Sequence, residues 1–194
     1  MSAPLIRAQA LVAGWQRPAT APLDFTLENG RILGLTGPNG VGKTTVLSAL
    51  AGSARVFSGT LERRPGLRLA LQTQDIPPVA GIPLSGRELL ALTGASSVGL
   101  PPWLVGRLDD RLERLSGGQR HYLALWAVLM APADLILLDE PTNNLDAAGV
   151  GHLSSALRRL AGSGTGIVVV SHDHEFVEAA CDQVIVLQEV ADGG

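Results

Sequence analysis

Short, continuous apolar runs recur along the chain, and stretches with helical patterning separate most of them. Uninterrupted apolar runs are typical of parallel strands, because helices cover both faces of a parallel sheet. The strands expected on this basis cover residues 32–35, 68–72, 135–138, 167–170 and 184–187. Helices are expected over residues 44–50, where Gly52 ends the helix, and over 147–160. This alternation predicts an α/β fold with a mostly parallel sheet.

The segment from residue 76 to about 114 has a different composition, rich in proline and glycine. Within it, helical pieces are expected around residues 87–92 and 103–115. We interpret this segment as a small helical insertion that continues through a helix after Ser116. The expected organisation is a single domain over residues 1–194, with a helical subdomain at about 77–133 inserted into the α/β core.

Composition narrows the classes of function. The 194 residues are 46% hydrophobic and 17% charged, with a net charge of -3, so no basic surface for nucleic acid is expected. The one cysteine, Cys181, cannot form an internal disulfide, which fits a reducing cytosol. Neither a secretory signal nor an uninterrupted apolar run of transmembrane length is visible. We therefore expect a protein that does not itself span a membrane but that could dock onto a partner that does.

The loop Gly37-Pro38-Asn39-Gly40-Val41-Gly42-Lys43-Thr44 matches the P-loop pattern, with an expected strand before it and a helix after it. Its glycines let backbone N–H groups turn towards phosphate oxygens at the positive end of the helix. Lys43, the only lysine in the chain, should reach the β- and γ-phosphates of ATP, and Thr44 should ligate Mg²⁺. The residues expected to bind nucleotide here are Gly37, Asn39, Gly40, Gly42, Lys43, Thr44 and Thr45.

A second chemical element follows the expected strand 135–138, which runs directly into Asp139 and Glu140. In P-loop enzymes an aspartate at such a strand end holds Mg²⁺. A glutamate beside it can accept a proton from the attacking water. By itself a strand that ends in two carboxylates is commonplace, but together with the P-loop it completes one expected site.

A third element, Leu115-Ser116-Gly117-Gly118-Gln119, begins a helix with a serine N-cap and two glycines, which is again an anion-receiving helix start. The pentapeptide resembles the signature of the ATP-binding cassette (ABC) ATPases, and the resemblance extends along nearly the whole chain. It implies an ABC-type P-loop NTPase with a small antiparallel β region. It also implies that Ser116, Gly117, Gly118 and Gln119 cover the γ-phosphate of ATP held by the P-loop of a second cassette.

The resemblance assigns further positions. Trp15 corresponds to an aromatic residue that stacks on adenine, and His172 to a histidine that contacts the γ-phosphate. Gln74 resembles the glutamine that reaches Mg²⁺ and the lytic water, with Gln72 as a rival. The loop 144–146 resembles the segment that touches the opposite cassette. On these grounds the expected catalytic residues are Glu140, His172, Gln74 and Lys43, and the expected metal ligands are Thr44, Gln74 and Asp139.

The resemblance thus implies an ATP-hydrolysing transporter subunit that forms a homodimer on ATP and Mg²⁺ and drives a membrane-spanning permease. Such a subunit would be cytoplasmic and peripheral on the cytoplasmic face of the cell membrane. The alternative is a non-transport ABC protein that acts on ribosomes or nucleic acid, but those usually carry two cassettes and a basic linker. A nucleotide sensor without turnover is disfavoured because the hydrolytic residues are present. Residues 81–90 resemble metal-ion importer cassettes only faintly, so the cargo stays open.

Overall fold

A parallel sheet of five strands forms the centre of the molecule in the computed structural model, which describes residues 3–73 and 84–188. The strand that precedes the P-loop and four further apolar runs pair in parallel, so that the carboxyl ends of all five strands meet at one edge. In spatial order the strands are β5 (Leu69–Gln72), β6 (Leu135–Asp139), β7 (Gly166–Val170), β3 (Ile32–Thr36) and β8 (Gln183–Val186). All five strands lie within one residue of the bounds expected from the hydrophobic pattern.

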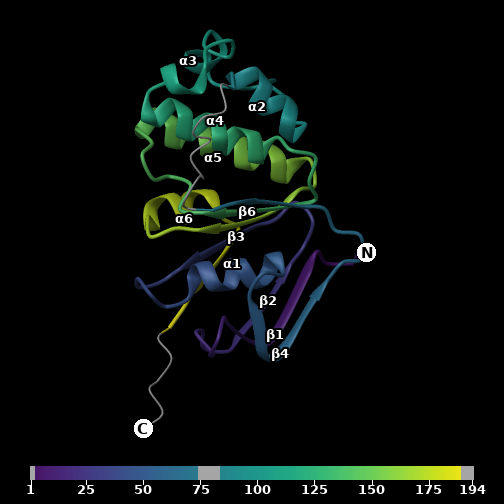
Figure 1. Cartoon of the computed structure of the whole chain (residues 1–194). Helices are drawn as coiled ribbons and strands as arrows, with labels where there is room; N and C mark the ends of the chain where they lie inside the picture. The colour runs from purple at the N-terminus through teal and green to yellow at the C-terminus, as the bar shows by residue number, and fades with distance from the viewer. Residues whose placement is uncertain (1–2, 74–83, 189–194) are drawn as a thin grey trace.

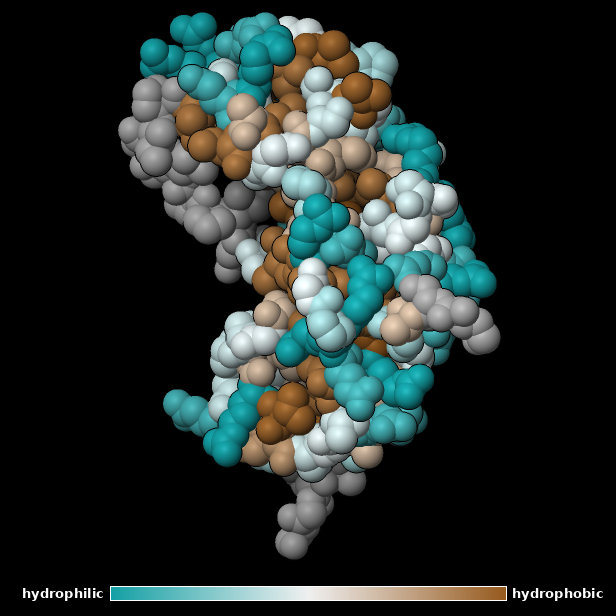
Figure 2. Space-filling view, turned by 90° about the vertical axis from the view of Figure 1, so that its right-hand side faces the viewer, coloured by the Kyte–Doolittle hydropathy of each residue, from teal (hydrophilic) through white to brown (hydrophobic). Residues whose placement is uncertain are grey.

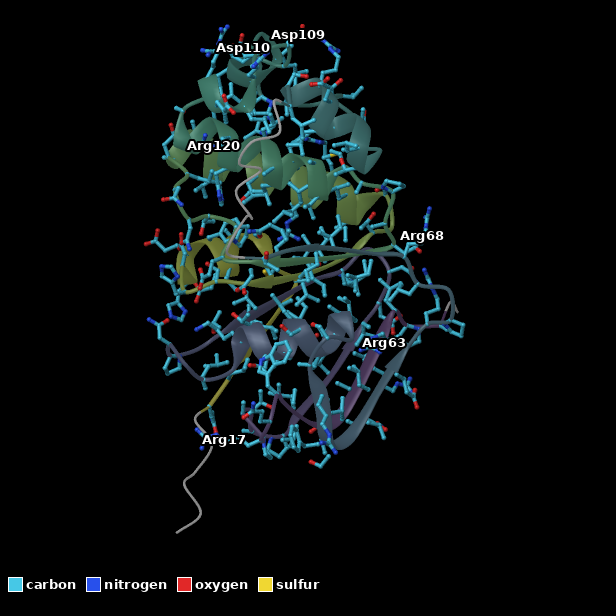
Figure 3. All side chains as sticks on the ribbon, in the orientation of Figure 1. Arg17, Arg63, Arg68, Asp109, Asp110 and Arg120 are labelled. Atoms are coloured by element: carbon cyan, nitrogen blue, oxygen red, sulfur yellow. The ribbon has the colours of Figure 1, made fainter. Side chains whose placement is uncertain are left out.

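Beneath the parallel sheet lies α1 (Lys43–Ala51), followed by a second, antiparallel sheet (Figure 1). The second sheet contains β2 (Leu23–Leu27), β1 (Ile6–Gly14) and β4 (Arg55–Arg63) in that order. α1 is apolar on several sides and packs between the two sheets in one hydrophobic cluster. Its carboxyl end is capped by Gly52 in the left-handed conformation, and Arg63 of β4 donates to the carbonyls of Ala49 and Leu50 (Figure 3).

Helices cover the opposite face of the parallel sheet (Figure 1). They share a second hydrophobic cluster with the upward-facing residues of the sheet. In chain order they are α2 (Gly86–Thr93), α3 (Pro102–Val105), the 3-10 turn η1 (Leu112–Arg114), α4 (Gly117–Leu129), α5 (Ala147–Gly162) and α6 (His174–Ala180).

The helical piece expected over residues 103–115 is wrong in its extent. α3 ends at Val105, and the next residues fold back onto the beginning of α2, where the Arg87 N–H donates to the Leu108 carbonyl. The Arg87–Asp109 ion pair at 2.7 Å holds this return, and Arg107 pairs with Asp110 (Figure 3). Tertiary hydrogen bonds therefore replace the helical ones that local patterning favoured.

Hydrophobic and polar side chains are interspersed on the face shown in Figure 2, and hydrophobic side chains lie over both the upper and the lower layer. Among the described helices, none has both the length and the apolar character that crossing a bilayer requires. The core of the molecule is instead divided between the two clusters on either side of the parallel sheet.

Candidate nucleotide-binding site

The P-loop connects the carboxyl end of β3 to the beginning of α1 and borders a cavity of about 520 Å³. Gly37, Gly40 and Gly42 all have positive φ, at 139°, 81° and 97°, a conformation that other residues adopt only with strain. At Gly42 a Cβ would also lie 2.7 Å from the Ala19 carbonyl oxygen. The loop therefore needs its glycines for its shape, and this shape presents the first turn of α1 to the cavity.

Lys43 is almost fully buried, at 8% exposure, although its side chain carries a charge. Its Nζ donates to the carbonyl oxygens of Gly37 at 2.8 Å and Pro38 at 2.9 Å. The ammonium is thus held inside the curve of the loop by the backbone itself. Because an ammonium is a compact point charge, it can exchange these carbonyls for phosphate oxygens without a large movement.

Asp139, at the end of β6, is 2% exposed, and its Oδ1 has no hydrogen-bond partner in the described part of the chain. Burial raises the pKa of this carboxyl and the charge of Glu140 adds to the increase, while a hydrogen bond from Thr44 and the charge of Lys43 oppose it. The unpartnered carboxylate oxygen of Asp139 and the Thr44 hydroxyl are both oxygen ligands of the hard type. Mg²⁺ is usually held by one or two such protein groups together with phosphates, so these residues fit that ion.

Glu140 and His172 meet at the carboxyl ends of the adjacent strands β6 and β7. The His172 Nδ1 lies 2.8 Å from the Glu140 Oε2, and the His172 backbone N–H donates to the same oxygen at 3.3 Å. Glu140 is 9% exposed, whereas the His172 side chain is 62% exposed. The exposed imidazole thus covers a carboxylate that is itself almost buried.

The structure brings most of the expected site residues to one cavity. Glu140 and His172 lie across it from the P-loop, and two residues that sequence reasoning had not assigned to the site, Asn143 and Val170, complete its lining. Asn143 could have been noticed from its position three residues after Glu140. The lining residues are Asn39, Gly40, Gly42, Lys43, Thr44, Thr45, Asp139, Glu140, Asn143, Val170 and His172.

Gly37 and Trp15 are expected nucleotide-binding residues that are not among that lining, although the Gly37 carbonyl oxygen accepts from the Lys43 Nζ. Trp15 follows the end of β1, and its side chain is 58% exposed. Gln74 lies outside the described residues. Its rival Gln72 ends β5 and is 4% exposed, and its register with Leu138 places it on the sheet face covered by α4, opposite to α1.

Ser116, Gly118 and Gln119 border a different cavity, of about 360 Å³, which shares no lining residue with the first; the expected Gly117 is not among its lining residues. The Ser116 Oγ accepts from the Gln119 N–H at 3.2 Å, and the Gln119 side chain accepts from the Ser116 N–H at 3.0 Å. This reciprocal capping box fixes the beginning of α4, as the serine N-cap predicted. The other walls come from Trp103 and from the loop after β6 with the first turn of α5: Asn144, Leu145, Asp146, Ala148 and Gly149.

Comparison with known proteins agrees with this geometry. The sequence model described as ABC transporter matches residues 20–80 and 84–143. The zinc import ATP-binding proteins ZnuC of Marinobacter nauticus and Alkalilimnicola ehrlichii are 33% and 34% identical, over 97% and 95% of this chain and 76% and 74% of their own lengths.

Solved structures give the same result at the level of the fold. A structure described as the ATP binding subunit of an ABC transporter aligns with a TM-score of 0.80 at 22% identity, over 95% of this chain and 86% of its own. A second, described as an inward-facing conformation of a putative metal-chelate type ABC transporter, aligns with a TM-score of 0.78 at 26% identity, over 95% and 79%. The expected α/β architecture of ABC type is confirmed.

Proposed function

The chain belongs to the ABC transporter family as an ATP-binding subunit with ATPase activity, and we propose that two copies assemble head to tail on Mg²⁺-ATP. Subunits of this family work with a membrane permease. In our proposal the homodimer binds to such a permease at the cytoplasmic face of the membrane and closes when ATP is bound. ATP hydrolysis then reopens the dimer.

One observation carries the proposal: among residues 3–73 and 84–188, two anion-receiving helix starts border separate cavities. The P-loop at α1 accommodates the triphosphate by itself, so the start of α4 is left for a phosphate from another molecule. Gly117 supports this inference. A Cβ there would meet nothing within 4 Å and its φ is not positive, so the monomer gives no reason for a glycine. Close approach of a nucleotide from a second copy would give one.

The proposed roles follow from where each group lies. Lys43 and the N–H groups of the P-loop hold the β- and γ-phosphates, and Thr44 with Asp139 would hold Mg²⁺. When bound, Mg²⁺ neutralises the charge that develops on the phosphates. Glu140 accepts the proton of the attacking water, after His172 leaves it for the γ-phosphate. Ser116 and the beginning of α4 of the second copy cover the same phosphate. Gln74 stays a proposed ligand on sequence grounds alone.

The proposed cargo is a divalent metal ion of the zinc class. Its support is the printed function of the relatives, which are zinc import proteins, together with the likeness to a metal-chelate type transporter. The cargo would pass through the permease, so no residue of this chain is expected to bind it. Cells that lack the gene should accumulate less zinc from a zinc-limited medium, measured with radioactive zinc. Unchanged zinc uptake with impaired uptake of another solute would contradict this assignment.

The central test is the variant Glu140→Gln. It removes the proton acceptor but keeps the volume of the side chain, so turnover should fall by about 10²–10⁴-fold while ATP still binds. Because hydrolysis no longer opens the dimer, the variant should elute as a dimer with ATP and Mg²⁺ and as a monomer without them. Light scattering after size exclusion measures this change, and phosphate release measures turnover.

The matched control is Glu62→Gln on the exposed surface of β4, which makes the same chemical change away from both cavities. It should keep full turnover and remain monomeric with ATP. Wild-type turnover in Glu140→Gln would refute the assigned role of Glu140. A Glu140→Gln chain that binds ATP but stays monomeric would refute the head-to-tail assembly.

A further inference from the structure

We propose that Trp103 forms part of the nucleotide site of the partner subunit and packs its indole against the nucleoside of the ATP held by the partner's P-loop. The inference rests on the proposed head-to-tail dimer and adds a residue to it. Trp103 belongs to the four-residue helix α3, which lies outside every motif of the sequence. Its side chain nevertheless lines the same cavity as Ser116 and Gln119.

The Trp103 indole is exposed, although the residue next to it is buried in the hydrophobic core. Trp103 is 40% exposed, while its neighbour Leu104 is 1% exposed and belongs to the hydrophobic cluster above the sheet. An exposed tryptophan that borders a cavity is more often a contact residue than a surface accident, because its large apolar face is costly to hydrate.

The position of Trp103 is fixed from below by other aromatic side chains. Its ring meets Tyr122 of α4 edge to face, with 5.0 Å between centroids. Tyr122 is fully buried, stacks on Trp126 at 6.3 Å, and its hydroxyl lies 2.7 Å from the His152 Nδ1 of α5. Trp126 is anchored in turn by its Nε1, which donates to the Ser96 carbonyl at 3.0 Å. The indole therefore stands on a rigid platform, and little entropy is lost when it contacts a ligand.

The groups that line the cavity suit two different parts of a ligand. Backbone N–H groups at the beginning of α4 and the Ser116 hydroxyl suit phosphate oxygens. An indole face offers nothing to phosphate but stacks well on a base or packs on a ribose. A bound molecule that presents a phosphate to Ser116 and an apolar surface to Trp103 is thus a nucleotide, held at its phosphate end by another chain.

Trp15 provides the complementary half of this arrangement. In the described part of the chain, Trp15 and Trp103 are the aromatic residues with large exposed surface. The loop over residues 15–20, which begins with Trp15, reaches the P-loop, since a Cβ at Gly42 would lie 2.7 Å from both the Ala19 carbonyl oxygen and the Thr20 Cγ2, and Trp103 borders the cavity at α4. When two copies face head to tail, Trp15 of one copy and Trp103 of the other would flank one nucleoside.

The test compares three substitutions in a Glu140→Gln background: Trp103→Ala, Trp103→Phe and Val105→Ala. Val105 is the matched control, since it lies on α3, is 53% exposed and does not line the cavity. Trp103→Ala should raise the ATP concentration for half-maximal dimerisation by about tenfold, in line with the loss of one stacking contact. Trp103→Phe should need an ATP concentration close to that of the parent, because phenylalanine keeps an aromatic face. Val105→Ala should match the parent. Equal ATP requirements for Trp103→Ala and Val105→Ala would overturn the proposal.

A second measurement identifies the part of the ligand that Trp103 contacts. With Glu140 intact, Trp103→Ala should raise the KM for ATP but leave the inhibition constant of magnesium tripolyphosphate within about twofold, because that inhibitor has no nucleoside. Equal increases in both constants would place Trp103 against protein or phosphate and overturn the nucleoside contact. A parent that never dimerises with ATP would instead refute the proposed assembly, and the two failures are therefore distinguishable.

Discussion

At the scale of single residues, the backbone of the site is strained at Glu140, the expected proton acceptor. Glu140 has a φ of 51°, a left-handed conformation that costs a residue with a side chain about 1–3 kcal/mol. Its backbone is held there by two hydrogen bonds, from its own N–H to the Val170 carbonyl at 2.8 Å and from the Asn143 N–H to its carbonyl at 3.2 Å. These bonds turn the chain sharply after Asp139, so that successive carboxylates face different parts of the cavity.

Asp139 leads to the first prediction. An ionised carboxyl that is buried with one oxygen unpartnered destabilises the nucleotide-free protein at neutral pH, since its pKa is raised and folding favours the protonated form. Asp139→Asn should therefore raise the melting temperature without nucleotide by roughly 2–4 °C, equivalent to about 1 kcal/mol. The same variant should lose the additional stabilisation that Mg²⁺ gives in the presence of ATP. Calorimetry with and without Mg²⁺-ATP measures both effects, and a lower melting temperature of the free variant would contradict the argument.

At the scale of elements, two of the described helices, α2 and α4, begin with the same capping box. Ser85 and Glu88 form a capping box at α2, just as Ser116 and Gln119 do at α4. Only the box at α4 borders one of the two cavities described above. The pair allows the structural role of a serine cap to be separated from a role in nucleotide binding.

The second prediction uses this pair. Ser85→Ala and Ser116→Ala should each cost about 1 kcal/mol of stability, because both remove the acceptor for a helix N–H. Only Ser116→Ala should also reduce turnover and weaken ATP-dependent dimerisation. Chemical unfolding and phosphate release on the two variants provide the comparison. Equal losses of turnover in both would mean that the cap at α4 acts through helix stability alone.

At the scale of the whole molecule, Asp134 ties the two sheets together. It lies before β6 and accepts from Arg68 (labelled in Figure 3), before β5, at 3.1 and 3.2 Å, and it is 3.8 Å from Arg64, which directly follows β4. The hydrogen bonds from Arg68 hold the pKa of Asp134 at about 2, below its ordinary value of 3.8. This end of the sheet is opposite to the site, so the contact bears on stability and not on catalysis.

The third prediction follows from the sign of that shift. Because the pKa of Asp134 is lowered in the folded state, its contribution is fully present above pH 3.8 and is lost as the pH falls towards about 2. Asp134→Asn should therefore lower stability at neutral pH and weaken the pH dependence in this range, without a change in the KM for ATP. Unfolding midpoints measured between pH 2 and 7 test this. An unaltered pH dependence would show that the ion pairs contribute nothing measurable, as many surface pairs do.

Much of the fold followed from local pattern. The strands 32–36, 135–139 and 166–170 are buried on both faces, so an unbroken apolar run identified each. The strands of the antiparallel sheet and α6 were not placed from the sequence: bulges break the alternation of β1, β2 has only five residues and α6 only seven. The helix expected over residues 103–115 failed for a different reason, since ion pairs and hydrogen bonds to α2 outweigh its helical patterning.

The sequence by itself determined the chemistry: Lys43, Thr44, Asp139 and Glu140 are recognisable because phosphate and Mg²⁺ restrict the residue types and backbone shapes that can hold them. Only the tertiary structure decided which of these groups share a space. Parallel pairing brings the ends of β3, β6 and β7 to one edge and thereby closes one cavity, while Ser116 is left beside a second cavity with Trp103. Contacts between residues distant in sequence depend on packing, and no local pattern contains them. For this reason the motifs could be recognised in the sequence, whereas the position of Trp103 beside the second cavity could not.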